Sequence, residues 1–318
     1  MFPFGVGVRD EIVTVFGGSG FLGRHAVRTL ARAGFRIRVA VRQPYIAGFL
    51  APMGDVGQIQ TTHGNIRSAS DIARAVRGAS AVVNMVGARA PWSGEGYRAL
   101  HLDGAILVAR AAMDAGAQTL VHFSTLDASF RSRTRQGRIR GQAEAAIREE
   151  FPAATIMRPA SAFGPEDRFT NRIAARAQIL PALLLRDAAR RLQPVFAGDV
   201  GAAVAKAVAD RECAKGRTYE LAGPNAMSHR ALCEWILSTI ERERAVLSLP
   251  GRARGDLVMR KGALSFTDLG IEPTTLAVLA PTYLARFRRR GQFRPRETPP
   301  SPPDAGGITV DSKAWTGG

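Results

Sequence analysis

The feature that most constrains the fold of this chain is a glycine-rich turn near its N-terminus, Gly17-Gly18-Ser19-Gly20-Phe21-Leu22-Gly23. The turn follows an apolar segment of strand length, residues 12–16, and opens a segment of helical period. With this spacing Gly17 permits the tight turn, Gly20 lets the backbone approach a phosphate, and Gly23 allows close packing of helix on strand. The helix N-terminus also offers unpaired N–H groups to phosphates. A plain βα turn has the same local form, but the flanking strand and helix favour a turn that binds a dinucleotide pyrophosphate.

Apolar segments of strand length alternate with longer segments of helical period along the first half of the chain. The predicted strands are residues 12–16, 37–41, 59–61, 81–86, 119–124 and 155–157, and the predicted helices are residues 21–33, 71–76, 99–115 and 139–149. This alternation is typical of βαβ units that build a parallel sheet. We therefore predict an α/β protein with a doubly wound, parallel-sheet Rossmann core over residues 10–160.

Beyond Arg158-Pro159 the regular alternation ends, and shorter helical and loop segments follow. We expect residues 161–291 to form a smaller C-terminal α/β annex, partly interleaved with the core and packed at the carboxyl ends of its strands. Residues 292–318 are rich in Pro, Gly and Ser and hold few large apolar side chains, so we expect them to form a disordered tail.

The composition narrows the classes of function. The formal net charge of +17 at pH 7 comes almost entirely from arginine and favours anionic partners such as nucleotides and anionic lipid headgroups. No nucleic-acid-binding motif occurs, so no nucleic-acid partner is expected. Two cysteines, Cys213 and Cys233, are too few for a disulfide framework and too far apart for a metal pair, which favours a reducing, cytoplasmic location without a metal. We expect neither a signal or transit peptide nor a spanning helix, so any membrane contact would be peripheral.

The end of the second predicted strand bears on the choice of nucleotide. In dinucleotide folds a carboxylate roughly 20 residues after the glycine turn accepts hydrogen bonds from the adenosine ribose. Here that place holds Arg42. A guanidinium cannot accept from a hydroxyl but forms charge-assisted bonds to a 2′-phosphate. We therefore predict NADP(H), with NAD(H) as the alternative if Arg42 is only one more surface arginine.

Two later strand ends fit the same pocket. Asn65 could bond the adenine amino group while Ile66 packs on the ring face, and the small Gly87, next to Val86, would let the cofactor pass. The alternative is that these residues form an ordinary turn and a buried strand.

With these residues in this order, the chain resembles the extended and atypical short-chain dehydrogenases/reductases as far as about Gln292. The glycine turn, the Gly64-Asn65-Ile66 turn, Arg158-Pro159 and the segment 193–200 carry the resemblance. It implies a Rossmann core that binds NAD(P), and it adds four residues to those near the cofactor: Ser124, Arg140, Arg158 and Pro159.

A narrower resemblance rests on the segment Phe163-Gly164-Pro165-Glu166-Asp167-Arg168-Phe169 and on residues 219–224. Both are similar to the nucleotide-binding accessory subunits of respiratory complex I (NADH:ubiquinone oxidoreductase), the alpha-subcomplex subunit 9 family, and to its bacterial relatives. Epimerases share the first three residues of the segment and rarely the rest. The resemblance implies an NADPH-binding accessory or assembly subunit.

The catalytic positions of the reductase family are only partly kept. The family uses a tyrosine as general acid or base, a lysine four residues later, and a serine that binds the substrate oxygen. Ser124 stands at the end of the fifth predicted strand, but the tyrosine and lysine positions hold Gln136 and Arg140. An amide cannot shuttle a proton, and an arginine is always charged. The sequence therefore predicts a degenerate site.

Two functions remain open, together with a plain metabolite sensor. The favoured one is an NADP(H)-binding, non-catalytic accessory or assembly subunit of complex I. The alternative is an active NAD(P)H-dependent reductase or epimerase with a displaced acid, for which Tyr97, Asp127 and His122 are the candidates.

A peripheral position on the cytoplasmic face of the inner membrane would suit the accessory function. The apolar residues 179–185 are followed by Arg186, Arg190 and Arg191, an order that suits contact with acyl chains and phosphates. A second arginine cluster, residues 288–290, ends the predicted folded part. The alternative is that residues 179–185 roof the cofactor pocket.

Overall fold

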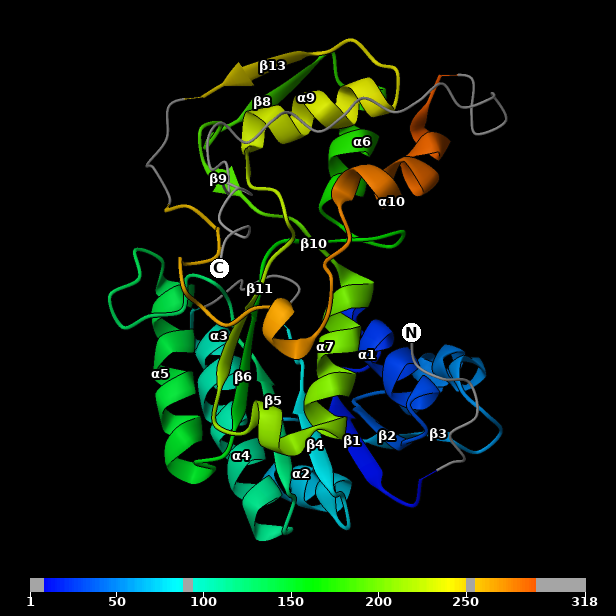
Figure 1. Cartoon of the computed structure of the whole chain (residues 1–318), viewed down its shortest axis with the longest axis vertical. Helices are drawn as coiled ribbons and strands as arrows, with labels where there is room; N and C mark the ends of the chain where they lie inside the picture. The colour runs from blue at the N-terminus through cyan, green and yellow to red at the C-terminus, as the bar shows by residue number, and fades with distance from the viewer. Residues whose placement is uncertain (1–8, 88–93, 250–254, 290–318) are drawn as a thin grey trace, which may run out of the picture.

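The computed structural model describes residues 9–87, 94–249 and 255–289. Its centre is a seven-stranded sheet in which every paired strand runs parallel to its neighbour (Figure 1). The spatial order is β11-β6-β5-β4-β1-β2-β3. The strands are β1 Ile12–Phe16, β2 Arg36–Val41, β3 Ile59–His63, β4 Ala81–Asn84, β5 Thr119–Phe123, β6 Thr155–Pro159 and β11 Thr218–Leu221.

Helices cover both faces of this sheet, as a doubly wound fold requires. One face carries α1 (Phe21–Arg32) and α7 (Ala197–Ala209). The other carries α2 (Ala69–Val76), α4 (Gly104–Asp114) and α5 (Arg135–Glu150). Each face has its own apolar cluster, since alternate strand residues point to opposite sides. Further helical elements are η1 Pro44–Met53, α3 Gly94–Arg98, η2 Ala99–Asp103, α8 Arg211–Ala214 and η3 Thr267–Leu269.

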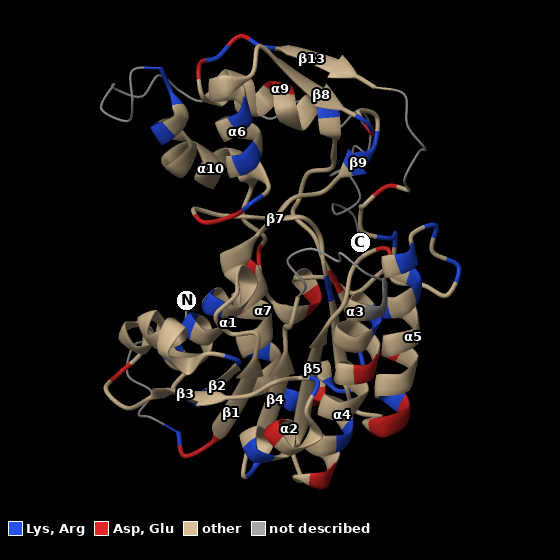
Figure 2. Cartoon of the chain, turned by 180° about the vertical axis from the view of Figure 1, so that it is seen from behind, with Lys and Arg blue, Asp and Glu red and all other residues tan. Residues whose placement is uncertain are grey.

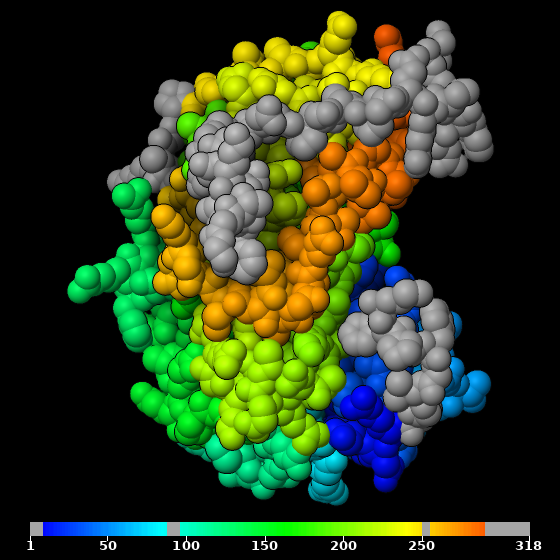
Figure 3. All heavy atoms as spheres, in the orientation of Figure 1, coloured from blue at the N-terminus to red at the C-terminus, as the bar shows by residue number. Residues whose placement is uncertain are grey.

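A second lobe sits above the carboxyl ends of the strands, with a third apolar cluster of its own (Figures 1 and 3). It contains α6 (Thr170–Ile179), α9 (His229–Thr239), α10 (Leu276–Leu284) and the parallel pair β8 (Ala182–Leu185) and β13 (Ala245–Ser248). The remaining elements are β7 Ala162–Phe163, β9 Arg191–Leu192, β10 Val195–Phe196, β12 Met227–Ser228 and η4 Ala285–Phe287.

The predicted α/β class, parallel sheet and second lobe are confirmed, and the details differ. The sheet has a seventh strand, β11, and one face is covered by α7, although both lie within residues 161–291. A four-residue strand so far along the chain carries no local signal that assigns it to the core. Residues 161–291 therefore contribute to the main sheet and its covering helices as well as to the second lobe.

Several predicted boundaries also shift. β4 ends at Asn84 rather than 86, and β5 ends at Phe123 rather than 124. Helix α5 begins at Arg135, before the predicted residue 139, because the Thr134 side chain accepts the Gly137 N–H at 2.9 Å and caps it. The predicted helix 99–115 starts as a π-helical turn. The predicted tail, residues 292–318, lies outside the described residues. Among the described residues, no helix is long and apolar enough to cross a membrane.

Candidate nucleotide-binding and catalytic site

The glycine turn between β1 and α1 has the geometry that its spacing predicts. Gly17 has a φ of 78°, the left-handed conformation that glycine adopts without strain. A Cβ at Gly17 would lie 2.7 Å from the Met85 carbonyl oxygen, so the turn runs directly against the end of β4. A Cβ at Gly23 would lie 2.1 Å from the Gly17 carbonyl oxygen. Helix α1 can therefore pack this closely on the turn only with glycine at both positions.

The N-terminal end of α1 fits a phosphate. Gly20 is the N-cap, and no side chain caps the first N–H groups of the helix. A Cβ at Gly20 would meet only the Gly17 carbonyl oxygen, at 3.1 Å, so the other side of Gly20 is open to a ligand. Phe21 instead points its ring toward His25, with centroids 5.6 Å apart, and toward Gly164 of the second lobe. Ser19 and Leu22 are partly buried.

Arg42 follows β2 directly and is exposed. Within the described residues it has no hydrogen-bond or ion-pair partner, so its guanidinium is free for an anion. The sequence did not point to a second arginine, Arg24 of α1. Its guanidinium carbon lies 5.2 Å from the centroid of the Phe49 ring, which belongs to η1, the element that follows Arg42. Its place directly after Gly23 was the available signal.

The residues that follow β3 and β4 differ in how far they are available to a ligand. The Asn65 Oδ1 accepts the Arg67 N–H at 3.1 Å, so this oxygen already serves the turn. Ile66 is 6% exposed and packs against Gly104 of α4, which places its side chain in the core rather than on a ligand-facing surface. Val86 donates its N–H to Asn84 Oδ1 at 3.2 Å. Gly87 is exposed, and nothing lies within 4 Å of a Cβ built there.

The catalytic positions come together around Arg140. Gln136 is exposed on the first turn of α5. The Arg140 Nε donates to the phenol oxygen of Tyr97 at 2.8 Å, and its Nη1 donates to the Phe123 carbonyl oxygen at 2.9 Å. Arg140 therefore joins α3 to the end of β5, directly before Ser124.

Buried polar atoms surround this bridge. Ser124 Oγ, Thr125 Oγ1 and His101 Nε2 have no hydrogen-bond partner among the described residues. The His101 ring lies 4.2 Å from the Tyr97 ring, centroid to centroid. Burial, and then the charge of Arg140, lowers the pKa of both His101 and His122 to about 3. Both imidazoles are therefore neutral near pH 7.

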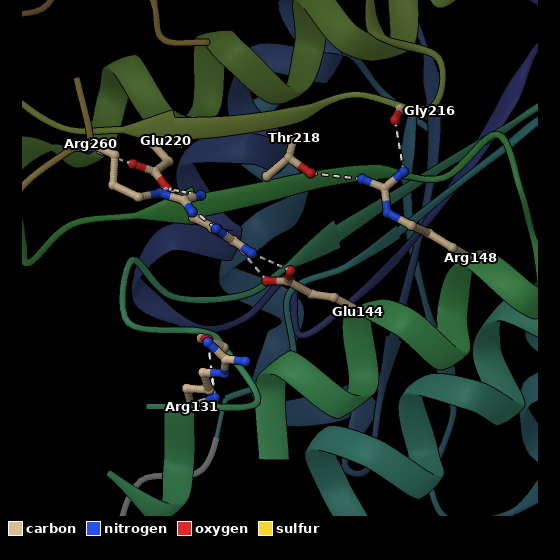
Figure 4. Close-up of polar contacts among 9 residues, drawn as sticks. Arg131, Glu144, Arg148, Gly216, Thr218, Glu220 and Arg260 are labelled. Atoms are coloured by element: carbon tan, nitrogen blue, oxygen red, sulfur yellow. Dashed lines mark hydrogen bonds and ion pairs between the residues drawn. The ribbon is translucent and has the colours of Figure 1, made fainter. Parts of the chain in front are cut away.

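Arg158 has a different environment from the one predicted. Its Nε and Nη2 bind both carboxylate oxygens of Glu144, at 2.9 and 2.5 Å, and its Nη1 donates to Glu220 at 3.3 Å. Arg260 also donates to Glu220, through its Nε at 2.7 Å (Figure 4). Burial alone would lower the pKa of Arg158, but Glu144 and then Glu220 raise it. The guanidinium therefore ties β6 to α5 and β11, and its N–H groups serve these carboxylates rather than a cofactor.

Asp167, within the segment 163–169, has a structural role. It is 4% exposed and accepts hydrogen bonds from the second lobe at both oxygens. Its donors are the N–H groups of Gly164, Phe169 and Asn171 and the hydroxyls of Thr170 and Tyr283. The segment thus fixes the start of α6 and ties it to α10.

Residues 17–180 match the protein-family model described as NAD(P)H-binding. The chain belongs to the extended short-chain dehydrogenase/reductase family. Within that family it is 30% identical to the mitochondrial NADH dehydrogenase (ubiquinone) 1 alpha subcomplex subunit 9 of Rattus norvegicus, over 90% of this chain and 84% of that protein. It is 33% identical to the ceramide reductase of Caulobacter vibrioides, over 54% of each chain. The dTDP-glucose 4,6-dehydratase DesIV of Streptomyces venezuelae, with NAD and TYD bound, shares the fold, with a TM-score of 0.72 at 21% identity over 88% of this chain and 97% of that one.

As an extended short-chain dehydrogenase/reductase, the protein matches the NAD(P)H-binding family over residues 17–180, while its helix α5 holds neither a tyrosine nor a lysine. The glycine turn fits a pyrophosphate, and a bound nicotinamide would supply hydride chemistry at the carboxyl edge of the sheet. Helix α5 carries neither the tyrosine nor the lysine, so the groups that would hold a proton there are the hydroxyls of Tyr97 and Ser124, with Arg140 bonded to the Tyr97 oxygen.

The two buried histidines predict acid sensitivity of this reductase-family fold. In the unfolded chain an imidazole takes up a proton below about pH 6.5, whereas His101 and His122 stay neutral in the fold down to about pH 3. Between these pH values the unfolded state binds more protons than the folded state. The free energy of unfolding therefore decreases as the pH is lowered, by at most about 1.4 kcal/mol per pH unit for each histidine. Urea denaturation at pH 7 and pH 5 measures this slope. We expect a His101→Asn/His122→Asn variant to have a shallower slope than the parent, and an equal slope would contradict the assignment.

Proposed function

We propose that the protein holds NADP(H) at the glycine turn and acts as an accessory or assembly subunit associated with respiratory complex I, rather than as a conventional reductase. The observation that carries this proposal is α5, where an exposed Gln136 and a bridging Arg140 stand in the two proton-transfer positions. Similarity to the complex I subunit of Rattus norvegicus over most of both chains supports it.

The NADP(H) part rests on Arg42. It is exposed and free of partners within the described residues, at the strand end beside which the adenosine ribose binds in this fold. Arg24 adds a second guanidinium near the same segment. Two such groups favour a 2′-phosphate over a 2′-hydroxyl, because a guanidinium donates and cannot accept.

Replacing Arg42 by aspartate is expected to abolish the preference for NADPH over NADH. The lost charge-assisted bonds correspond to about 1–3 kcal/mol, or roughly 5- to 150-fold in relative affinity. Calorimetric titration of both nucleotides measures the ratio. Arg172→Asp, on the exposed side of α6, makes the same change of charge away from the turn and should leave the ratio unchanged. Equal affinities of the parent protein for both nucleotides would refute the NADP(H) assignment.

The association with complex I is tested by affinity purification of the tagged protein from detergent-solubilised membranes. We expect complex I subunits to be recovered with it, and we expect nucleotide released on denaturation to be NADP(H). Recovery of nucleotide without any complex I subunit would refute the accessory function and leave the nucleotide site standing.

A peripheral location on the cytoplasmic face of the inner membrane belongs to the same proposal. Only part of the apolar segment 179–185 is available for contact with a membrane, because Leu183 and Leu185 are buried in the second lobe, at 4% and 8% exposure. Ile179, Leu180 and Leu184 remain exposed. Flotation with vesicles of anionic lipid at low salt tests the location, and a protein that stays wholly in the aqueous fraction would contradict it.

A second candidate function is an NAD(P)H-dependent reductase. Two observations favour it, the hydrogen bond between Arg140 and Tyr97 and the similarity to a ceramide reductase. The amount of NADPH oxidised per protein molecule distinguishes the two functions. An accessory subunit oxidises no more than one equivalent of bound NADPH, whereas a reductase turns over many equivalents with a carbonyl substrate.

A further inference from the structure

We propose that Tyr97 takes the place of the missing α5 tyrosine and donates from its phenol O–H to the carbonyl oxygen of a ketone or quinone ligand, with Arg140 as its positioning residue and Ser124 as a second donor. The inference rests on the proposed NADP(H) site, since the ligand would lie at its nicotinamide end. It holds for an accessory subunit that binds such a ligand and for a reductase that converts it.

The geometry around Arg140 places the phenol. One guanidinium spans the Tyr97 oxygen, at 2.8 Å, and the Phe123 carbonyl oxygen, at 2.9 Å. The next residue after Phe123 is Ser124, whose N–H donates to the Met157 carbonyl oxygen at 2.7 Å and so fixes the strand end. A single bridging side chain therefore connects Tyr97 to the residue directly before Ser124, although 43 residues separate Tyr97 from Arg140.

The hydrogen-bond roles leave the phenol proton free. A guanidinium only donates, so the Tyr97 oxygen is the acceptor in its bond with Arg140. The phenol O–H then needs an acceptor of its own, and the described residues supply none. Because Tyr97 is 9% exposed, this donor has little access to water. A ligand oxygen is the group that would satisfy it.

The neighbouring hydroxyls need a partner too. Ser124 Oγ and Thr125 Oγ1 are buried without one in the part of the chain that the structure describes, and Ser124 is 3% exposed. A buried polar group without a partner destabilises the fold, and folded proteins rarely leave several together. Their position at the end of β5, next to the Arg140 bridge, indicates donors for a ligand oxygen.

The backbone beneath the phenol is also unusual. Ala99–Asp103 form a π-helical turn, a local widening that often occurs at functional sites. It carries His101, whose ring packs on the Tyr97 ring and stays neutral. A neutral imidazole supports the ring without adding a second cation next to Arg140.

For a ketone, the balanced step is a two-electron reduction. The carbonyl carbon accepts a hydride from the reduced nicotinamide and forms a C–H bond, while the oxygen takes the Tyr97 proton and forms an O–H bond. The C=O π bond breaks, the products are a secondary alcohol and the oxidised nicotinamide, and the phenolate regains a proton from water that enters once the alcohol has left. Arg140 cannot supply the proton, because it remains charged throughout.

Binding of a carbonyl probe tests the inference without relying on turnover. Menadione, a quinone, and 2-tridecanone, an aliphatic ketone, are titrated into the full-length protein saturated with NADP⁺, which cannot reduce them. We expect at least one probe to bind, and Tyr97→Phe to weaken it by about tenfold, as the loss of one hydrogen bond in a buried site predicts. Tyr45→Phe is the matched control, since Tyr45 is 78% exposed on η1, and it should leave probe affinity unchanged.

Further measurements test the role of Arg140 and show whether the Tyr97 variant still binds the nucleotide. Arg140→Gln should weaken the probe as Tyr97→Phe does, and Arg140→Lys should restore much of the affinity because an ammonium can still donate to the phenol oxygen. NADPH affinity should stay within about twofold in Tyr97→Phe, as expected for a residue away from the pyrophosphate turn. If NADPH also oxidises with a probe, Tyr97→Phe should lower kcat by about 100-fold or more.

The outcomes separate the two proposals. Probe binding that is equal in the parent and Tyr97→Phe, or absent from the parent, overturns the role of Tyr97 while the nucleotide site stands. A parent protein that binds no NADPH overturns the proposed function, and the inference falls with it.

Discussion

Replacing Arg158 by alanine is expected to lower the free energy of unfolding by about 3–5 kcal/mol, the range for removing one partner of a buried ion pair. Arg158 is 9% exposed and binds Glu144 and Glu220, which are 8% and 1% exposed. Glu220 would keep Arg260, whose backbone N–H and Nε donate to it at 2.8 and 2.7 Å. Glu144 would keep no cation among the described residues, so most of the cost falls on that carboxylate. Urea denaturation at pH 7 measures the loss.

Two further variants make the result specific. Arg36→Ala removes an exposed pair with Asp10 and should cost less than about 1 kcal/mol. Arg158→Ala combined with Glu144→Leu removes the stranded carboxylate and should recover part of the stability lost in the single variant. A loss below about 1 kcal/mol in Arg158→Ala itself would show that the pair contributes no more than a surface ion pair does.

Arginine in this chain serves the fold as well as its ligands. Arg148 donates to the Gly216 carbonyl oxygen and to Thr218 Oγ1, both at 2.7 Å, and so ties α5 to β11 (Figure 4). Arg38 donates to the carbonyl oxygens of Ala75 and Arg77 at the end of α2. Lys and Arg are spread over both lobes (Figure 2). A net charge of +17 therefore does not mark a single anion-binding face.

The sequence predicts the parts of this protein that depend on local chemistry. The glycine turn, the six early strands and the loss of the α5 tyrosine and lysine are each encoded within a few neighbouring residues. Their periodicity and spacing are sufficient, because strand, turn and helix are set by short-range rules. The geometry of the glycine turn could be anticipated for the same reason.

Long-range pairing is what the sequence leaves open. Arg158 stands at a strand end, as a cofactor ligand would, but its partners lie 14 and 62 residues away. Tyr97 was one of three candidate acids, and only the fold brings it to Arg140. In the same way, β11 pairs with β6 although α6 and α7 lie between these two strands along the chain. Such contacts depend on the tertiary fold, and no local pattern specifies them.

Replacing Gly23 by alanine is expected to weaken NADPH binding by about 100-fold or more, equivalent to at least about 2.7 kcal/mol. A methyl group there would lie 2.1 Å from the Gly17 carbonyl oxygen and 2.7 Å from the Gly18 Cα, both backbone atoms of the turn. The helix must then move away from the turn, and the N–H groups that would meet the pyrophosphate move with it. Gly48→Ala is the matched control, because nothing lies within 4 Å of a Cβ at that position on η1 and it should bind NADPH as the parent does. Fluorescence titration of NADPH compares the three proteins, with circular dichroism to show that each is folded. A folded Gly23→Ala variant with the affinity of the parent would show that the pyrophosphate does not bind at this turn.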